Sequence, residues 1–103
     1  MYFANKLKKL REEHGYLQRQ IASLLEIDTP MYSRIERGER IAKEDFIPIL
    51  AKYFNEDPKQ LRQLWLADKI YDVLNGEEQA PEVLNMVAED FQEYGTIKTD
   101  DTE

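Results

Sequence analysis

The sequence predicts an all-α protein, and three observations support that prediction. No stretch of the 103 residues alternates apolar and polar side chains for long enough to form a sheet strand. Apolar residues instead recur three or four positions apart in successive segments, which is the spacing of one helix face. Glycine and proline fall between those segments, where helices begin or end. The length suits one domain, and a hydrophobic share of 42% can build a core.

The first two predicted helices are short. The first spans residues 3–14, and its apolar face consists of Phe3, Leu7, Leu10 and His14. Gly15 follows where a left-handed C-cap is wanted. The second spans residues 18–25, about two turns, with an apolar stripe of Ile21, Ala22, Leu24 and Leu25.

The third predicted helix runs from Thr29 to Arg37 and stops at Gly38. Asp28 is a good N-cap, and Pro30 falls in the first turn, where its missing N–H is not needed. Only residues 26–28 separate this helix from the second, which is too short a connection for antiparallel packing. Two short helices joined by such a turn form a helix-turn-helix unit, whose second helix lies in the major groove of DNA.

Three further helices follow. The fourth begins near Glu44 or Asp45 and tolerates Pro48 in its first turn. The fifth follows Asp57-Pro58 and is apolar on all sides, so it needs burial on more than one side. The sixth spans Pro81–Tyr94, and its apolar residues are Val83, Leu84, Val87 and Phe91. Residues 95–103 are polar, and we expect them to form a flexible acidic tail.

The charge of the chain is divided unevenly. The net charge of −7 alone argues against nucleic acid, whose protein partners are usually basic. Residues 1–53, however, carry ten basic and eight acidic groups, whereas residues 54–103 carry four basic and thirteen acidic groups. This asymmetry predicts two roles in one chain. The acidic half either maintains solubility, opposes indiscriminate phosphate binding or docks a basic protein.

Several motifs of the N-terminal half match one family. They are Gly15-Tyr16-Leu17-Gln18, Ile21-Ala22, Leu25, Ile27 and Ser33-Arg34-Ile35-Glu36-Arg37-Gly38. With these motifs the chain resembles the XRE/Cro/phage-repressor class of regulators over about its first 66 residues. The resemblance implies a lambda-repressor-like five-helix DNA-binding domain with a C-terminal helical extension. We therefore expect a DNA-binding domain over residues 1–66 and a helical extension, which dimerises, over residues 67–94.

The resemblance also implies roles for individual residues. The outward residues of the third helix, expected to contact bases, are Thr29, Pro30 and Arg34. Arg34 is the strongest candidate, because a guanidinium pairs bidentately with guanine. The expected phosphate contacts are Gln18, Arg19, Ser33, Arg37, Arg40 and Lys43, although Arg37 and Arg40 have the alternative of being solvated charges beside Glu36 and Glu39. Arg11 and Glu36 are expected to form a structural ion pair.

Two residues depart from the family pattern. Leu17 stands where the family usually has Ser or Thr, so the second helix loses its usual cap. Glu26 stands where the family usually has Gly, so this turn is strained if its φ is positive. Both departures affect the turn rather than the DNA-facing residues.

The fifth helix is the candidate dimer interface, since a single helix-turn-helix has a small footprint on DNA. The expected interface residues are Trp65, Leu66, Ile70, Tyr71, Val73 and Leu74. One apolar stripe, with Leu61, Leu64 and Trp65, would close the domain core. In the alternative, both stripes of the helix are buried within one chain, with the sixth helix folded back.

These observations favour a homodimeric, cytoplasmic regulator that binds double-stranded operator DNA, for example the controller of a restriction–modification cassette. An alternative is an antitoxin-type protein whose acidic half binds a partner protein while the other half autoregulates its promoter. A third is an interaction module that has lost DNA binding. The sequence offers no Ser/His/Asp set, a single His and no Cys, so we expect no enzyme, metal or cofactor. No apolar run approaches the roughly 18 residues of a membrane span.

Overall fold

A computed structural model describes residues 1–94 of the chain, and every regular element in that range is a helix. The helices are α1 (Tyr2–Glu13), α2 (Gln18–Leu25), α3 (Thr29–Glu36), α4 (Phe46–Phe54), α5 (Pro58–Leu74) and α6 (Ala80–Tyr94). The all-α prediction is therefore confirmed over these residues. The expected flexible tail, residues 95–103, lies outside them. The chain divides into two units, Met1–Val73 and a second that begins at Leu74.

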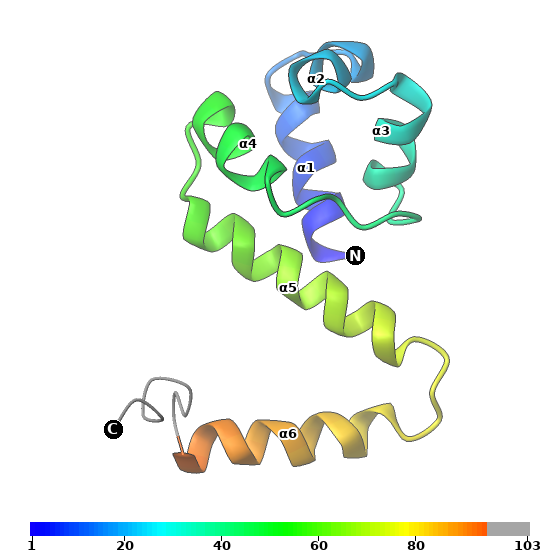
Figure 1. The fold of residues 1–103 in the computed structure, drawn as a ribbon, viewed down its shortest axis with the longest axis vertical. Coiled ribbons are helices and arrows are strands. Elements are labelled where there is room, and N and C mark those ends of the chain that lie inside the picture. The colour runs from blue at the N-terminus through cyan, green and yellow to red at the C-terminus, as the bar shows by residue number, and fades with distance from the viewer. Residues whose placement is uncertain (95–103) are drawn as a thin grey trace. The chain divides into compact units, whose positions relative to one another are not determined.

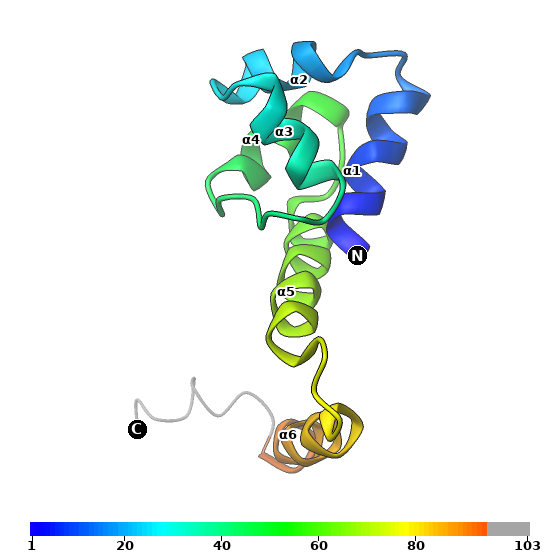
Figure 2. The ribbon, with the colours of Figure 1, turned by 90° about the vertical axis from the view of Figure 1, so that its right-hand side faces the viewer.

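The first unit has one hydrophobic core. Figures 1 and 2 show α1 to α4 packed together at one end of α5, next to its N-terminal half. The side chains of Ile21, Tyr32 and Leu50 are completely enclosed, and they come from α2, α3 and α4. Residues from α1 and α5, among them Phe3, Leu7, Leu61 and Trp65, complete the core. Every helix of this unit therefore contributes its apolar face to the same core.

Two polar side chains of α5 fasten this helix to the rest of the unit. Asp68 is 4% exposed, and its carboxylate accepts hydrogen bonds from the N–H groups of Phe3 (3.1 Å) and Ala4 (3.3 Å). It thus provides an acceptor for free N–H groups in the first turn of α1, although Asp68 lies at least 64 residues further along the chain. The indole N–H of Trp65 donates to the carbonyl of Ala42 at 2.8 Å. This bond fixes the loop between α3 and α4 against α5.

The predicted helix boundaries have a local chemical basis. Asp57 accepts the N–H of Lys59 at 2.9 Å and caps α5. Pro48 is the third residue of α4, so it stands in the first turn, where no intrahelical N–H bond is lost. Gly15 has φ +73°, the left-handed conformation expected after α1.

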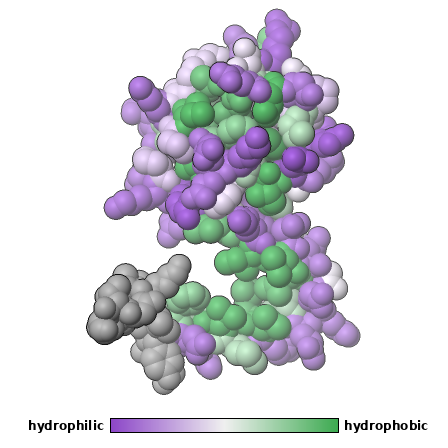
Figure 3. All heavy atoms as spheres, in the orientation of Figure 1, coloured by the Kyte–Doolittle hydropathy of each residue, from purple (hydrophilic) through white to green (hydrophobic). Residues whose placement is uncertain are grey.

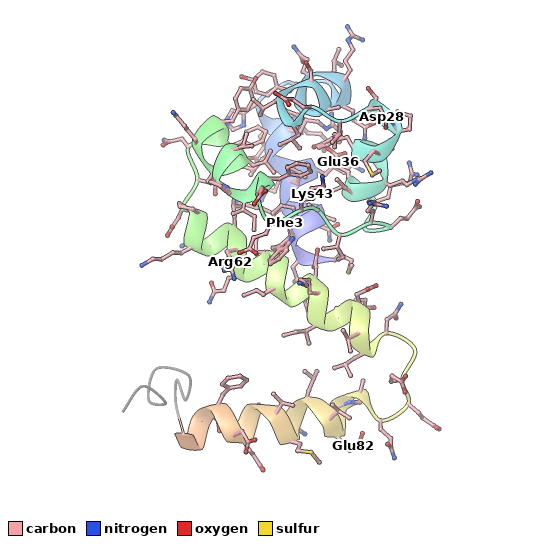
Figure 4. The ribbon with its side chains drawn as sticks, viewed as in Figure 1. Phe3, Asp28, Glu36, Lys43, Arg62 and Glu82 are labelled. Carbon is pink, nitrogen blue, oxygen red and sulfur yellow. The ribbon has the colours of Figure 1, made fainter. Side chains whose placement is uncertain are left out.

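The described part of the second unit, residues 74–94, contains the helix α6. Its apolar residues lie on one face and are exposed, and they include Val83, Leu84, Val87 and Phe91. Figure 3 shows hydrophobic side chains along this helix. The carboxylate of Glu82 points away from the helix (Figure 4). An amphipathic helix of this length is only marginally stable in isolation.

Candidate nucleic-acid interface

Helices α2 and α3 form the predicted helix-turn-helix. The turn begins at Glu26, which has φ 60° and ψ 41° in the left-handed region. The backbone N–H of Ile27 donates to the carbonyl of Ala22 at 3.0 Å, which is the bond of a left-handed helix end. Glu26 therefore takes the backbone conformation that a glycine would favour, at a cost of about 1 kcal/mol.

The start of α2 is stabilised by Gln20, a residue for which the sequence predicted no role. Leu17 has no side-chain oxygen and cannot cap the helix. The side-chain oxygen of Gln20 instead accepts the backbone N–H of Leu17 at 2.7 Å. This is half of a capping box, and a glutamine three residues after the cap position was the available signal.

The start of α3 follows the prediction. The carboxylate of Asp28 accepts the N–H of Met31 at 2.8 Å, and Pro30 stands in the first turn. Figure 4 shows Asp28 at the beginning of α3, on the surface of the unit. The first turn of α3 is thus capped as predicted.

A buried hydrogen-bond network fixes α3 against α1 and α2. Glu36, 4% exposed, accepts a hydrogen bond from Arg11 Nη2 at 3.1 Å and forms an ion pair with the same guanidinium. It also accepts from the hydroxyl of Tyr32 at 2.6 Å and from the amide of Gln18 at 3.0 Å. Arg11 Nη1 donates to the carbonyl of Tyr16 at 2.9 Å. The network holds three helices together, and Figure 4 shows Glu36 on the inner side of α3.

The same network changes the ionisation of its members. Burial disfavours the charged form of Glu36, but hydrogen bonds from Arg11, Tyr32 and Gln18 outweigh it and hold the pKa of Glu36 below its ordinary value. Burial, together with the hydrogen bond to Glu36, raises the pKa of Tyr32 well above that of a free phenol. The hydrogen bond to Glu36 raises the pKa of Arg11, although burial opposes it. Glu36 and Arg11 are therefore both charged near neutral pH.

The outer side of α3 carries the predicted base contacts. Thr29, Pro30 and Arg34 are all exposed, whereas Tyr32 and Ile35 face the core. An exposed guanidinium on a short helix is free to reach the edge of a guanine. The three predicted base contacts thus lie on one element and on its solvent side.

The predicted phosphate contacts fall into two groups. Arg19, Arg37, Arg40 and Lys43 are exposed, whereas Gln18 and Ser33 are half-buried. A polar groove of about 670 Å³ between α1, α2 and α3 brings together Gln18, Ser33 and Arg37, with Lys8 beside them. The amide of Gln18 is already bonded to Glu36, so this residue could offer a phosphate mainly its backbone N–H at the start of α2.

Two features are absent from the described residues. No group of three or more His, Asp or Glu side chains within residues 1–94 could hold a metal ion. No helix in that range has both the length and the apolar character that crossing a membrane requires.

A family model for the helix-turn-helix matches residues 7–61, which is more than half of the chain. The match begins within α1, contains the whole of α2, α3 and α4, and ends in the second turn of α5. The chain belongs to the XRE/Cro/CI family of helix-turn-helix proteins. Neither a curated protein nor a solved structure matches it.

The expected dimer residues of this helix-turn-helix protein lie in two environments. Leu66, Ile70, Tyr71 and Val73 are between 40% and 74% exposed, and Leu74 is partly exposed. Trp65 is 5% exposed and packs in the core of the first unit, with the Lys69 ammonium 4.7 Å from its ring centre. Trp65 is therefore a core residue in this chain, and its indole is not available as the centre of an exposed interface. This position agrees with the stripe of Leu61, Leu64 and Trp65 that was predicted to close the core, and the hydrogen bond to Ala42 adds a long-range contact that helix spacing does not reveal.

Proposed function

We propose that this helix-turn-helix protein is a sequence-specific transcriptional regulator that binds operator DNA with α3 in the major groove. The observation that supports this proposal most directly is the division of α3 into two sides. Its inner side is fixed by the Glu36 network, while its outer side presents Arg34, Thr29 and Pro30 to solvent. A rigidly held helix with a free guanidinium is suited to reading base edges.

Phosphate contacts then orient α3 on the duplex. Arg19 lies at the start of α2, and Arg37, Arg40 and Lys43 follow the end of α3. Cations at both ends of the helix-turn-helix can bind the two DNA backbones that border the groove. Their contribution is independent of sequence and falls as salt rises.

Dimerisation is part of the proposal, because one helix-turn-helix covers only half of a typical operator. The exposed side chains of Leu66, Ile70, Tyr71 and Val73 support it, since they recur along the C-terminal half of α5. Changing Leu66 and Ile70 to Asp should give a monomer by light scattering and weaken operator binding. A dimer that persists with both changes would locate the interface elsewhere.

In the proposed role, the dimer occupies an operator near a promoter in the cytoplasm and represses a compact operon, such as a restriction–modification cassette. Selection of duplexes from a random pool, followed by sequencing, tests this role. We expect the pool to converge on a site with two related halves about one helical turn apart. A pool that stays random would contradict sequence-specific binding.

A second candidate function is supported by α6. Its apolar stripe is exposed. Residues 70–97 contain no Lys or Arg, so every charged side chain of the helix is acidic. In that case the N-terminal half autoregulates a promoter while α6 binds a basic protein, as an antitoxin does. Changing Val87 and Phe91 to Asp should then abolish co-purification with that partner and leave DNA binding intact. Loss of DNA binding in this variant would argue against the separation of roles.

A further inference from the structure

The side chain of Arg37 already has a hydrogen-bond partner for every one of its nitrogens. Its Nε donates to Glu39 Oε2 at 3.0 Å, and its Nη2 donates to Glu39 Oε1 at 3.1 Å. Its Nη1 donates to the hydroxyl of Ser33 at 2.6 Å. The two parallel bonds to Glu39 have the bidentate geometry with which a guanidinium also binds a phosphate.

The other predicted DNA-contacting cations differ from Arg37. Within the described residues, Arg19, Arg34, Arg40 and Lys43 form no salt bridge. Arg37 is therefore the member of this set whose charge is neutralised inside the chain. Its partner lies only two residues away, on the loop that follows α3.

Glu39 is held at this position by the backbone. Its N–H donates to the carbonyl of Arg34 at 2.9 Å, which fixes the start of the loop to the end of α3. The hydrogen bond from Arg37 lowers the pKa of Glu39, and the nearby charge of Arg34 adds to the effect. Glu39 is therefore ionised under ordinary conditions.

The pair is exposed enough to exchange partners. The side chains of Arg37 and Glu39 are 54% and 55% exposed, so water screens their attraction. A DNA phosphate that arrives at this surface could replace the carboxylate without opening the core.

We propose that Glu39 acts as an internal phosphate mimic, which binds the guanidinium of Arg37 in the free protein and competes with the DNA backbone for it. This inference rests on the proposed function. Glu39 then lowers the sequence-independent part of the affinity, because the Arg37–phosphate contact forms only after the Arg37–Glu39 pair is broken. The base contact of Arg34 is not made through this pair.

A double-mutant cycle tests the competition. The proteins are the full-length wild type, Arg37→Ala, Glu39→Gln and the double variant, and the probe is a mixed-sequence duplex of about two helical turns. We expect Glu39→Gln to bind about five-fold more tightly at 0.15 M salt and to steepen the log–log salt dependence by up to about 0.9, the value of one phosphate contact, because the wild type forms the Arg37–phosphate contact only in part. Arg37→Ala should weaken the Glu39→Gln protein by about five-fold but the wild type by about two-fold or less.

The matched control is Glu56→Gln, which removes an ion pair with Lys6 at the turn between α4 and α5. This turn lies on the opposite side of the first unit from α3 (Figure 1). We expect Glu56→Gln to change the affinity for DNA much less than Glu39→Gln does.

The outcomes separate the two proposals. If the effects of Arg37→Ala and Glu39→Gln on binding are additive, Glu39 merely repels DNA and the competition is disproved. If Glu39→Gln behaves like Glu56→Gln, Glu39 has no role at the interface. If the wild type binds no duplex at low salt, the proposed function itself fails.

Discussion

The two sides of α3 each carry an arginine–glutamate pair, and the pairs differ in burial. On the inner side, the side chains of Arg11 and Glu36 are 12% and 2% exposed, and Tyr32 and Gln18 also bond to the carboxylate. On the outer side, the side chains of Arg37 and Glu39 are 54% and 55% exposed, and only Ser33 joins them. The same pair of side chains forms a fixed structural contact where water is excluded, and we propose that it forms an exchangeable contact where water enters.

The largest effect expected from this comparison is on stability. Glu36→Ala leaves Arg11 largely buried without its carboxylate and Tyr32 without its acceptor, so we expect the free energy of unfolding to fall by about 3–5 kcal/mol. Denaturant unfolding measures it. The control is Glu39→Ala, which should change stability by no more than about 0.5 kcal/mol, as is usual on a surface. Equal losses from the two variants would show that burial does not distinguish the pairs.

The next effect is the response of the inner pair to acid. Because the pKa of Glu36 is lowered in the folded chain, its ionised form stabilises the fold above the ordinary glutamate pKa. That stabilisation is lost as pH falls through the lowered, folded-state pKa. The unfolding midpoint of the wild type should therefore drop more steeply in acid than that of Glu36→Gln. If the unfolding midpoints of the two proteins depend on pH in the same way, the pKa of Glu36 is not lowered in the folded chain.

The outer side should affect recognition more than stability. Arg34→Ala removes the candidate guanine contact, so we expect a loss of about 1–3 kcal/mol in discrimination between the selected site and a variant of it. Competition binding with the two duplexes measures this. Unfolding of Arg34→Ala should resemble that of the wild type, since its side chain is exposed. A uniform loss on both duplexes would instead make Arg34 a phosphate contact.

The smallest effect is expected from Arg37→Ala. Because Glu39 already occupies the guanidinium, we expect binding to every duplex to weaken by only about two-fold and sequence preference to stay the same. The same competition assay measures it. A change in the preferred sequence would show that Arg37 contacts bases.

The sequence predicted the helices because their signals are local. Apolar spacing located all six helices of residues 1–94, and Asp28 with Pro30 marked the start of α3 in both sequence and structure. The strain at Glu26 was expected only if its φ is positive, and the structure gives a φ of 60°.

The contacts that the sequence did not predict either join residues far apart in the chain or involve side chains that have more than one possible partner. Asp68 caps α1 from α5, and Trp65 bonds to the loop at Ala42; neither follows from residue spacing within one helix. The phosphate contact of Gln18 stays a prediction, but the hydrogen bond from its amide to Glu36 was not predicted, because it depends on the fold bringing the start of α2 beside the inner side of α3. The pairing of Arg37 with Glu39 depends on the loop conformation, which periodicity does not encode.

The most direct test of the central claim is the salt dependence of binding to the selected duplex and to a scrambled duplex of the same composition. If α3 reads bases and its flanking cations bind phosphates, the selected duplex should bind about 10³-fold or more tightly than the scrambled one. Both affinities should fall steeply with salt. Equal affinities for the two duplexes, or binding that does not respond to salt, would contradict the account.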